Sequence, residues 1–244
     1  MQGNSINNNS SAGKLLEENI LFEDNHIIII NKLPSQIVQG DKTGDKPLSD
    51  LVKEYIKGKY NKSGEVFLGV VHRLDRPVSG AVIFARTSKS LTRLNALIKN
   101  REIHKTYWAV VKNKPPKESD TLVNFLRRDE ARNKSFITRD NSKNSQMASL
   151  SYKLIASSDN YYLLEIDLQT GRHHQIRAQL AGIGCPIKGD LKYGFDRSNS
   201  DGSIHLHARK LTFTHPVTLK PISIIAFPPN DPVWNYFSQN SDTF

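Results

Sequence analysis

The sequence predicts an α+β protein with a mixed, largely antiparallel β-sheet and flanking helices. Short apolar runs bounded by polar turns are typical of strands, and they outnumber the segments in which apolar residues recur at helical spacing. Hairpin-like strand pairs alternate with longer crossovers, as in a mixed sheet. The chain has 244 residues, 37% of them hydrophobic, which is enough for a core.

In the first half of the chain, turn residues and periodicity separate strands from helices. The polar turn Glu23-Asp24-Asn25 divides two Ile-rich runs, which are therefore expected to pair as strands. Pro47 suits the first turn of a helix, and Thr87 or Ser88 can cap a second one. We expect strands over residues 20–22, 27–30, 67–71 and 81–85 and helices over 48–57 and 88–99.

The second half contains one segment with weak periodicity. Residues 112–145 are rich in Lys, Arg, Asn and Ser, and we expect a basic excursion with a small hairpin at 135–139. This segment is a candidate RNA-facing flap, and an ordinary solvated loop is the alternative. We expect strands over 106–111, 146–155, 161–168, 204–214 and 222–227 and a short helix over 174–182.

The N-terminal residues differ in composition from the rest. Residues 1 to about 13 are almost free of apolar side chains, so we expect residues 1–19 to be a disordered or poorly ordered tail and 20–244 to be one domain. The start of the chain lacks the basic and apolar regions of a secretory signal, and no apolar run approaches the ~20 residues that span a bilayer. Cys185 is the only cysteine, which excludes an intrachain disulfide, and a cytoplasmic protein is expected.

The charge balance favours a polyanionic partner. Lys and Arg number 34 against 24 Asp and Glu, for a formal net charge of +10 and a pI of about 9.6. Basic side chains that reach phosphates release condensed counterions, which drives binding to nucleic acids. A basic protein without a nucleic-acid partner fits the composition equally well.

The segment His72-Arg73-Leu74-Asp75-Arg76-Pro77-Val78-Ser79-Gly80 is the first candidate site. It lies between two predicted strands, and Pro77 and Gly80 constrain its backbone. Arg73 and Arg76 flank Asp75, and nearby guanidinium groups favour the charged carboxylate that a nucleophile or base requires. The same arginines are suited to hold phosphates. A salt-bridged turn is the alternative.

The segment Thr170-Gly171-Arg172-His173-His174-Gln175-Ile176-Arg177 is the second candidate site. It follows a predicted strand, and Thr170 can cap the helix that begins soon after it. Arg172 would lie at the positive end of that helix, where anions are favoured. A basic helix start with exposed arginines is the alternative.

Aromatic and histidine side chains bear on base stacking and on metal binding. Tyr107 and Trp108 face opposite sides of one predicted strand; core packing is favoured for Trp108, and the other ring is available to stack on an extruded base. His205 and His207 share a strand face, but without accompanying ligand spacing no metal site is expected. The sequence contains no Gly-rich phosphate loop and no nucleophile elbow around Ser79, which disfavours nucleotide cofactors and hydrolase chemistry.

Several motifs in a fixed order resemble the RluA-type pseudouridine synthases. HRLDRPVSG at 72–80 looks like the segment that carries the catalytic Asp of that family, and KTYWAVV at 105–111 looks like its Lys-x-Tyr-x-Ala element. TGRHHQIR at 170–177, followed by GCPIKGDLKYG at 184–194, resembles the second signature. The end motifs ILFEDNHIIIINKLP at 20–34 and LHARKLTFTHP at 206–216 extend the resemblance over about residues 20–228.

The resemblance implies a sheet split by a central RNA-binding cleft and an enzyme that isomerises specific uridines in ribosomal or transfer RNA to pseudouridine. Asp75 would be the catalytic carboxylate acting on a flipped-out uridine, Tyr107 would pack against the uracil and serve as the base for the C5 proton, and Arg177 would pair with Asp75. No cofactor and no metal are implied, the expected partner is RNA, and a monomer is expected. With about 19 residues before the first predicted strand, no preceding S4 domain is expected. The implied RNA-binding side chains are those of His72, Arg73, Arg76, Arg172 and His173.

Two other interpretations compete with an isomerase. A non-catalytic RNA-binding protein with the same fold would bind RNA without changing it. A metal-dependent nuclease would use Asp75 with His205 and His207. The set Asp75, Tyr107 and Arg177 favours the enzyme, because a pure binder does not need all three. The target RNA, the choice between attack of Asp75 at C1′ and removal of a C2′ proton, and the role of residues 112–145 stay open.

Overall fold

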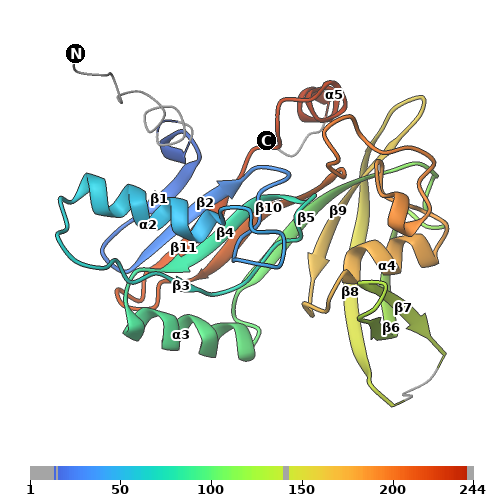
Figure 1. Ribbon diagram of the computed structural model, residues 1–244. Coiled ribbons are helices and arrows are strands. Elements are labelled where there is room, and N and C mark those ends of the chain that lie inside the picture. Colours follow the sequence, from blue (N-terminus) through green and yellow to red (C-terminus); the bar gives the residue numbers. More distant parts are fainter. Residues whose placement is uncertain (1–13, 15, 140–142, 241–244) are drawn as a thin grey trace.

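An eleven-stranded mixed sheet organises the computed structural model, which describes residues 14, 16–139 and 143–240 (Figure 1). The strands are β1 (Ile20–Glu23), β2 (Ile27–Lys32), β3 (Gly69–Val70), β4 (Ser79–Ala85), β5 (His104–Val111), β6 (Ser119–Asp129), β7 (Lys134–Thr138), β8 (Ser145–Ser157), β9 (Tyr162–Leu168), β10 (Leu206–Thr214) and β11 (Pro221–Ile225). The helices are α2 (Leu48–Lys59), α3 (Ser88–Lys99), α4 (Gln175–Gly182) and α5 (Pro232–Asn240), with a 3-10 turn η1 (Leu191–Tyr193).

The order of the strands confirms the predicted fold class. Along the sheet they run β1-β2-β4-β10-β5-β9-β8-β6-β7, with β3 added to β4 and β11 added to β10. β4 and β10 are parallel, and the other strand pairs of the described chain are antiparallel. Strands β10 and β5 at the centre therefore join the half formed by β1, β2 and β4 to the half formed by β6–β9.

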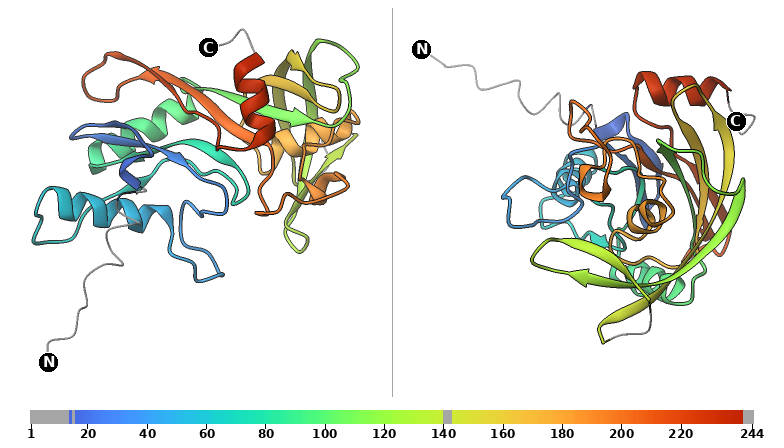
Figure 2. Two further views of the ribbon diagram at one scale, coloured as in Figure 1. Left: turned by 90° about the horizontal axis from the view of Figure 1, so that it is seen from above. Right: turned by 90° about the vertical axis from the view of Figure 1, so that its right-hand side faces the viewer.

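Helices cover both faces of this sheet. Side chains of a β-strand alternate between the two faces, and β5 carries apolar residues on both of them. Ala109 and Val111 of β5 belong to the main core, which also contains apolar residues of α2 and α4. Trp108 and Val110, one position out of phase, pack with Trp234 of α5 on the opposite face. The predicted core position of Trp108 is thus confirmed. The right-hand view of Figure 2 shows β6 and β8 curving around α4.

The segment 112–145 differs from its prediction. It contains two strands of the sheet, β6 and β7, and β6 pairs with β8 from Ser119↔Lys153 to Arg127↔Ser145. The sequence of β6 lacks the apolar alternation that marks a strand. Most of its side chains are accordingly exposed or half-buried, and Leu126 alone is fully buried. Backbone pairing with its neighbours, rather than its own side chains, makes this segment a strand. Helix α5 was also not predicted.

Other elements appear where they were expected, with shifted ends. The predicted cap of α3 is confirmed, since the Thr87 hydroxyl accepts a hydrogen bond from Ser90 N at 3.1 Å. The predicted tail lies mostly outside the described residues, but Leu16 is buried in the main core and Asn19 O accepts a hydrogen bond from Asn31 N at 2.8 Å. In the part of the chain that the structure describes, no helix has the length and apolar content of a membrane span.

Candidate active site

A cleft of about 860 Å³ lies between the loop before β4 and the loop before α4. Its volume falls within the range of sites that enclose one small ligand. Seven Lys and Arg side chains and two Asp side chains line it, so its field favours an anion. The basic residues are Arg73, Lys99, Arg101, Lys105, Arg128, Arg172 and Arg177, and the acidic ones are Asp75 and Asp167.

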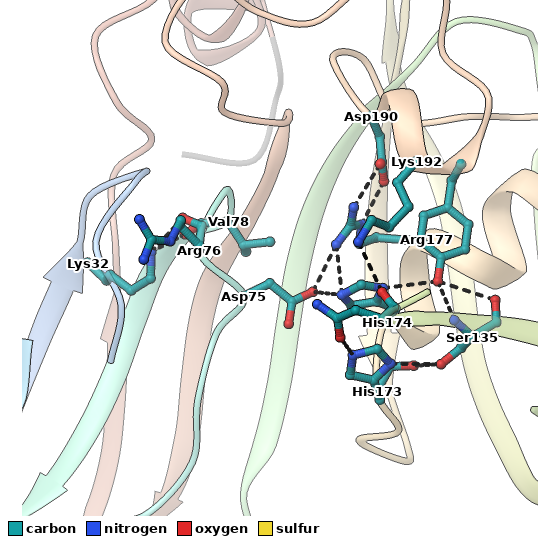
Figure 3. A network of polar contacts seen from close by, with 12 residues as sticks. Lys32, Asp75, Arg76, Val78, Ser135, His173, His174, Arg177, Asp190 and Lys192 are labelled. Carbon is teal, nitrogen blue, oxygen red and sulfur yellow. Dashed lines mark hydrogen bonds and ion pairs between the residues drawn. The ribbon is translucent and has the colours of Figure 1, made fainter. Parts of the chain in front are cut away.

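Asp75 and Arg177 meet inside this cleft, as the resemblance implied. The Asp75 side chain is 34% exposed, and its Oδ2 accepts a hydrogen bond from Arg177 Nη1 at 3.2 Å. The two residues lie 102 positions apart, one in the β3–β4 loop and the other on α4. Figure 3 shows the carboxylate between the β4 side of the cleft and the α4 side. A partly exposed carboxylate with a fixed guanidinium partner is suited to act on a bound molecule.

The backbone of the Asp75 loop is held by a lysine that the sequence analysis did not single out. Lys32 is fully buried, and its Nζ donates hydrogen bonds to the carbonyl oxygens of Leu33 (2.9 Å), Arg76 (3.2 Å) and Val78 (2.6 Å) (Figure 3). Burial lowers the pKa of Lys32 from 10.5 to about 7. The available signal was a lysine that continues an Ile-rich strand, because a charged side chain at the end of a buried strand needs partners.

The far end of the same loop is fixed by Gly80. This glycine has φ +117° and pairs with Ala208 where β4 runs beside β10. A Cβ at this position would lie 2.4 Å from Ala208 O, so any other residue would push the two strands apart. The predicted constraint at Gly80 is therefore a close approach of two backbones, which fixes where the loop ends.

Arg177 is anchored from its other side by Asp190, which the sequence analysis quoted only as part of a motif. Nε and Nη2 of Arg177 donate to the two carboxylate oxygens of Asp190 at 2.7 and 2.8 Å, and both side chains are buried. Burial alone would lower the pKa of Arg177, but the hydrogen bonds and charge of Asp190, and then the charge of Asp75, raise it. The guanidinium therefore stays charged and cannot rotate freely.

His174 lies at the centre of the polar network, directly before α4. Its backbone adopts the left-handed conformation, with φ 52°, and the ring is buried. Nε2 is 3.0 Å from Arg177 Nη1 and 3.3 Å from Asp75 Oδ2, and Nδ1 is 3.0 Å from the Tyr193 hydroxyl. Burial, and then the charge of Arg177, lowers the pKa of His174 to about 2.

Tyr107, the third predicted catalytic residue, lies on β5 and lines the cleft with its largely buried ring. Burial, and then the negative charge of Asp75, raises the pKa of the phenol well above its usual value. The hydroxyl therefore keeps its proton at neutral pH. The ring face is suited to stack on a base.

The five predicted RNA-binding residues occupy different environments. Arg73 and Arg172 are exposed and line the cleft, and Arg172 Nε donates to Met147 O at 3.0 Å. His173 also lines the cleft, held by Ser135.

The side chains of the other two residues, His72 and Arg76, are bound by other parts of the protein. His72 lines the cleft, but its Nε2 accepts a hydrogen bond from Ile83 N at 3.2 Å. Burial, and then the charge of Lys105, keeps the pKa of His72 well below its usual value, so the ring is neutral. Arg76 does not line the cleft, and its Nη1 pairs instead with Asp45 Oδ2 at 2.6 Å. Residues that are adjacent in the chain, such as Asp75 and Arg76, need not direct their side chains to the same face. Four further basic residues of the cleft were not predicted to bind RNA. Lys105 begins the quoted motif KTYWAVV, and the others, Lys99, Arg101 and Arg128, come from segments with no motif.

Two further predictions concern Thr170 and the histidine pair. The predicted cap by Thr170 is wrong: its hydroxyl bonds the Gln175 side chain and Ser149 N, and α4 has no side-chain cap. His205 bonds Asp231 and His207 bonds Ser79, and neither ring lines the cleft that contains Asp75. Among residues 14, 16–139 and 143–240 there is no group of three or more His, Cys, Asp or Glu placed to hold a metal ion.

Comparison with known proteins gives one consistent result. The family model described as RNA pseudouridylate synthase matches residues 26–182. The uncharacterized RNA pseudouridine synthase YhcT of Bacillus subtilis is 34% identical over 207 residues, covering 83% of this chain and 66% of the relative. Ribosomal large subunit pseudouridine synthase C of Rickettsia bellii is 32% identical, covering 88% and 70%. The chain thus spans about two thirds of the length of these relatives.

Solved structures with a similar fold agree with the family match. Human RNA pseudouridylate synthase domain containing 4 superposes with a TM-score of 0.76 at 25% identity, covering 93% of this chain and 94% of the other. Human RNA pseudouridylate synthase domain containing 1 superposes with a TM-score of 0.69 at 18% identity, covering 96% and 89%. The second match is a match of fold.

Proposed function

The chain belongs to the RNA pseudouridylate synthase family, and we propose that it isomerises specific uridines in structured RNA to pseudouridine with Asp75 as the catalytic carboxylate. The observation that carries this proposal is the pairing of Asp75 with Arg177 inside a basic cleft. Anchored by Asp190, the guanidinium presents Nη1 to the carboxylate. Asp75 Oδ2 accepts that hydrogen bond, while the exposed part of the side chain is open to the cleft.

The reaction requires an unstacked nucleotide. A uridine that leaves its stack loses a few kcal/mol of stacking and pairing energy, which contacts in the pocket offset. The Tyr107 ring supplies a stacking face, and exposed arginines at the cleft, such as Arg73 and Arg172, are placed for the flanking phosphates. Closure of RNA over the cleft excludes water from the reacting sugar.

Within this site the chemistry is an isomerisation without net redox change. The N1–C1′ bond breaks, the uracil turns, the C5–C1′ bond forms, the C5 proton is released to solvent, and N1 takes up a proton from solvent. Asp75 acts either by attacking C1′, forming a sugar ester that the uracil C5 displaces, or by removing the C2′ proton, which is later returned. Neither route consumes an oxidant, a reductant or a metal ion, so the proposal includes no cofactor.

Tyr107 is proposed as the uracil-stacking residue. Because its phenol is protonated at neutral pH, it acts as the base for the C5 proton only after its own proton has moved elsewhere. The raised pKa of Tyr107 thus disfavours the base role, and the stacking role rests on the place of the ring at the cleft.

For the substrate, ribosomal RNA is the first choice. The relatives from Rickettsia bellii and Zymomonas mobilis are named ribosomal large subunit pseudouridine synthases. Transfer RNA remains the second choice. The proposal further takes the protein to be a cytoplasmic monomer whose catalytic domain begins at about residue 20.

The test is tritium release from RNA that carries 5-tritiated uridine. Unmodified transcripts of large-subunit ribosomal RNA and of transfer RNAs are incubated separately with the wild type, Asp75→Asn and Asp167→Asn. Asp167 is an exposed aspartate of the same cleft, so its variant controls for the loss of one negative charge there. We expect release with the wild type and Asp167→Asn, none with Asp75→Asn, and similar RNA affinity for all three.

The competing interpretations predict different results in the same assay. A non-catalytic binder retains RNA without releasing tritium. A nuclease cleaves the transcripts on a gel and stops when a chelator is added. Substantial release by Asp75→Asn would overturn the assignment of Asp75.

A further inference from the structure

We propose that His174 and Tyr193 are positioning residues that couple the β6–β7 hairpin (residues 119–138) to the Asp75–Arg177 pair through a fixed tautomer of His174. Figure 3 shows this network, which runs from Ser135 on β7 to Asp75. The inference rests on the function proposed for Asp75. It assigns to the hairpin a role in turnover in addition to a role in RNA binding.

The link begins with the hairpin backbone. Ser135 N donates to the Tyr193 hydroxyl at 2.8 Å, and that hydroxyl donates to Ser135 O at 3.2 Å, both contacts being buried. Burial raises the pKa of Tyr193 to about 12, so the hydroxyl keeps the proton that this bond needs. Tyr193, the last residue of η1, is therefore bound to the backbone of β7 and not to one of its side chains. A shift of that backbone would shift the Tyr193 hydroxyl.

The tautomer of His174 follows from its two neighbours. A guanidinium has donors only, so Nε2, which lies 3.0 Å from Arg177 Nη1, must be the acceptor. The Tyr193 hydroxyl donates its one proton to Ser135 O, so it must accept a hydrogen bond from Nδ1 at 3.0 Å. Both constraints place the proton on Nδ1. The ring stays neutral, because burial and then the charges of Arg177, His173, Lys192 and Arg128 oppose a second proton.

This tautomer determines how Arg177 presents its hydrogens. One Nη1 hydrogen goes to His174 Nε2 and the other to Asp75 Oδ2, while Nε and Nη2 are bound by Asp190. In the opposite tautomer, an Nε2 proton would face Arg177 Nη1 and would lie 3.3 Å from Asp75 Oδ2. The imidazole would then displace the guanidinium and bind the carboxylate that has to react. The Tyr193 hydroxyl prevents this arrangement.

The hairpin is the part of the chain that RNA would move. It carries the exposed basic side chains Arg127, Arg128 and Arg132, and Arg128 lines the cleft. Two further contacts hold the hairpin. The Ser135 hydroxyl donates to His173 O in the segment before α4 at 2.6 Å, and Lys192 Nζ of η1 donates to Asn133 O at 3.0 Å. RNA bound to these arginines would therefore act on the position of Tyr193, and through it on His174.

The first test reads the tautomer directly and requires no activity. Imidazole nitrogen shifts are recorded by NMR on ¹⁵N-histidine-labelled wild type, Tyr193→Phe and Tyr152→Phe, and the His174 signals are assigned by their loss in His174→Gln. Tyr152 is a buried tyrosine whose hydroxyl donates to Lys117 O, so its variant is the matched control. We expect a neutral ring with the proton on Nδ1 from pH 5 to pH 8 in the wild type and the control, and a proton on Nε2 in Tyr193→Phe. A wild-type proton on Nε2, a charged ring at pH 7, or an Nδ1 proton that stays in place in Tyr193→Phe would overturn the proposal.

The second test separates turnover from binding. Tyr193→Phe keeps the ring but loses the hydroxyl, and we expect kcat to fall about 10- to 100-fold, as for other losses of alignment, while KM for RNA changes less than about threefold. His174→Gln, whose amide oxygen can accept from Arg177, is expected to retain more turnover than His174→Leu. A higher KM with unchanged kcat, or equal loss in Tyr152→Phe, would make Tyr193 a binding or packing residue. The tautomer result stands whether or not Asp75→Asn is active, so the two proposals fail independently.

Discussion

The two sides of the cleft hold Asp75 in different ways. On the β4 side, Lys32 donates hydrogen bonds to two backbone carbonyls of the loop, those of Arg76 and Val78, and to the carbonyl of its own neighbour Leu33. On the α4 side, Arg177 contacts the carboxylate and no loop backbone. The first arrangement sets where the loop runs, and the second sets how the side chain is oriented and charged. Position and orientation of the carboxylate are therefore separable properties, and variants on either side should affect them unequally.

The largest effect is expected on the α4 side, from Arg177→Met. This change removes the partner of Asp75 and leaves Asp190 buried without its guanidinium. An unpaired buried carboxylate costs about 3–5 kcal/mol, and loss of an electrostatic partner at the reacting group lowers kcat by about 10²- to 10³-fold. Denaturant unfolding and tritium release measure the two effects.

The double variant Arg177→Met/Asp190→Leu separates stability from catalysis. It removes the buried pair as a unit, which is expected to restore most of the unfolding free energy, since well-packed apolar residues replace buried ion pairs at little cost. Turnover should remain as low as in the single variant. Recovery of activity together with stability would show that Arg177 acts only by holding the fold, and the comparison between the two sides would then lose its basis.

A smaller effect is expected on the β4 side, from Lys32→Met. Loss of the donor to two carbonyls of the loop, those of Arg76 and Val78, loosens it, and kcat should fall about 10-fold or somewhat more, with RNA affinity retained. The exposed Lys57→Met on α2 is the matched control and should leave kcat unchanged. If Lys32→Met released tritium at the wild-type rate, the loop would be held without the lysine.

Lys32 also predicts a pH dependence of stability. Burial lowers its folded pKa to about 7, so between pH 7 and about 10 the unfolded chain carries a proton on this amine that the folded chain lacks. The unfolding free energy of the wild type therefore rises with pH in that window relative to Lys32→Met, by at most about 1.4 kcal/mol per pH unit. Below pH 7 the difference is constant. A flat difference from pH 6 to pH 10 would show that the amine keeps an ordinary pKa.

The proposed catalytic residues could be located from the sequence better than the residues that hold them. Asp75, Tyr107 and Arg177 stand in motifs, and the structure places all three at the cleft. Their partners Lys32 and Asp190 could not be assigned roles, because each role exists only after segments far apart in the chain have met. A lysine or an aspartate in a sequence does not reveal which distant group its side chain will contact in the folded protein.

Closeness to Asp75 in the sequence, by contrast, predicted a place at the cleft for Arg76 that the structure does not give it. Arg73 lies two residues before Asp75 and Arg76 lies directly after it, yet of these two arginines Arg73 alone lines the cleft. Arg76 lies in the turn that Val78 N closes on Asp75 O, and Asp45 binds its side chain there. In the same way, β6 was missed because its partners β7 and β8, and not its own pattern, define it as a strand.

The smallest effects are expected from this arginine pair, and they test whether exposure at the cleft decides RNA contact. Arg73→Ala should weaken RNA binding and lower the slope of log K against log salt by about one, as for the loss of one phosphate contact. Arg76→Ala should leave the slope unchanged and cost less than about 1 kcal/mol of stability, because its ion pair with Asp45 is largely exposed. Filter binding of labelled RNA over a range of KCl concentrations measures both slopes. A lower slope in Arg76→Ala would mean that Arg76 leaves Asp45 for RNA, and the loop before α2 would then become part of the RNA-binding surface.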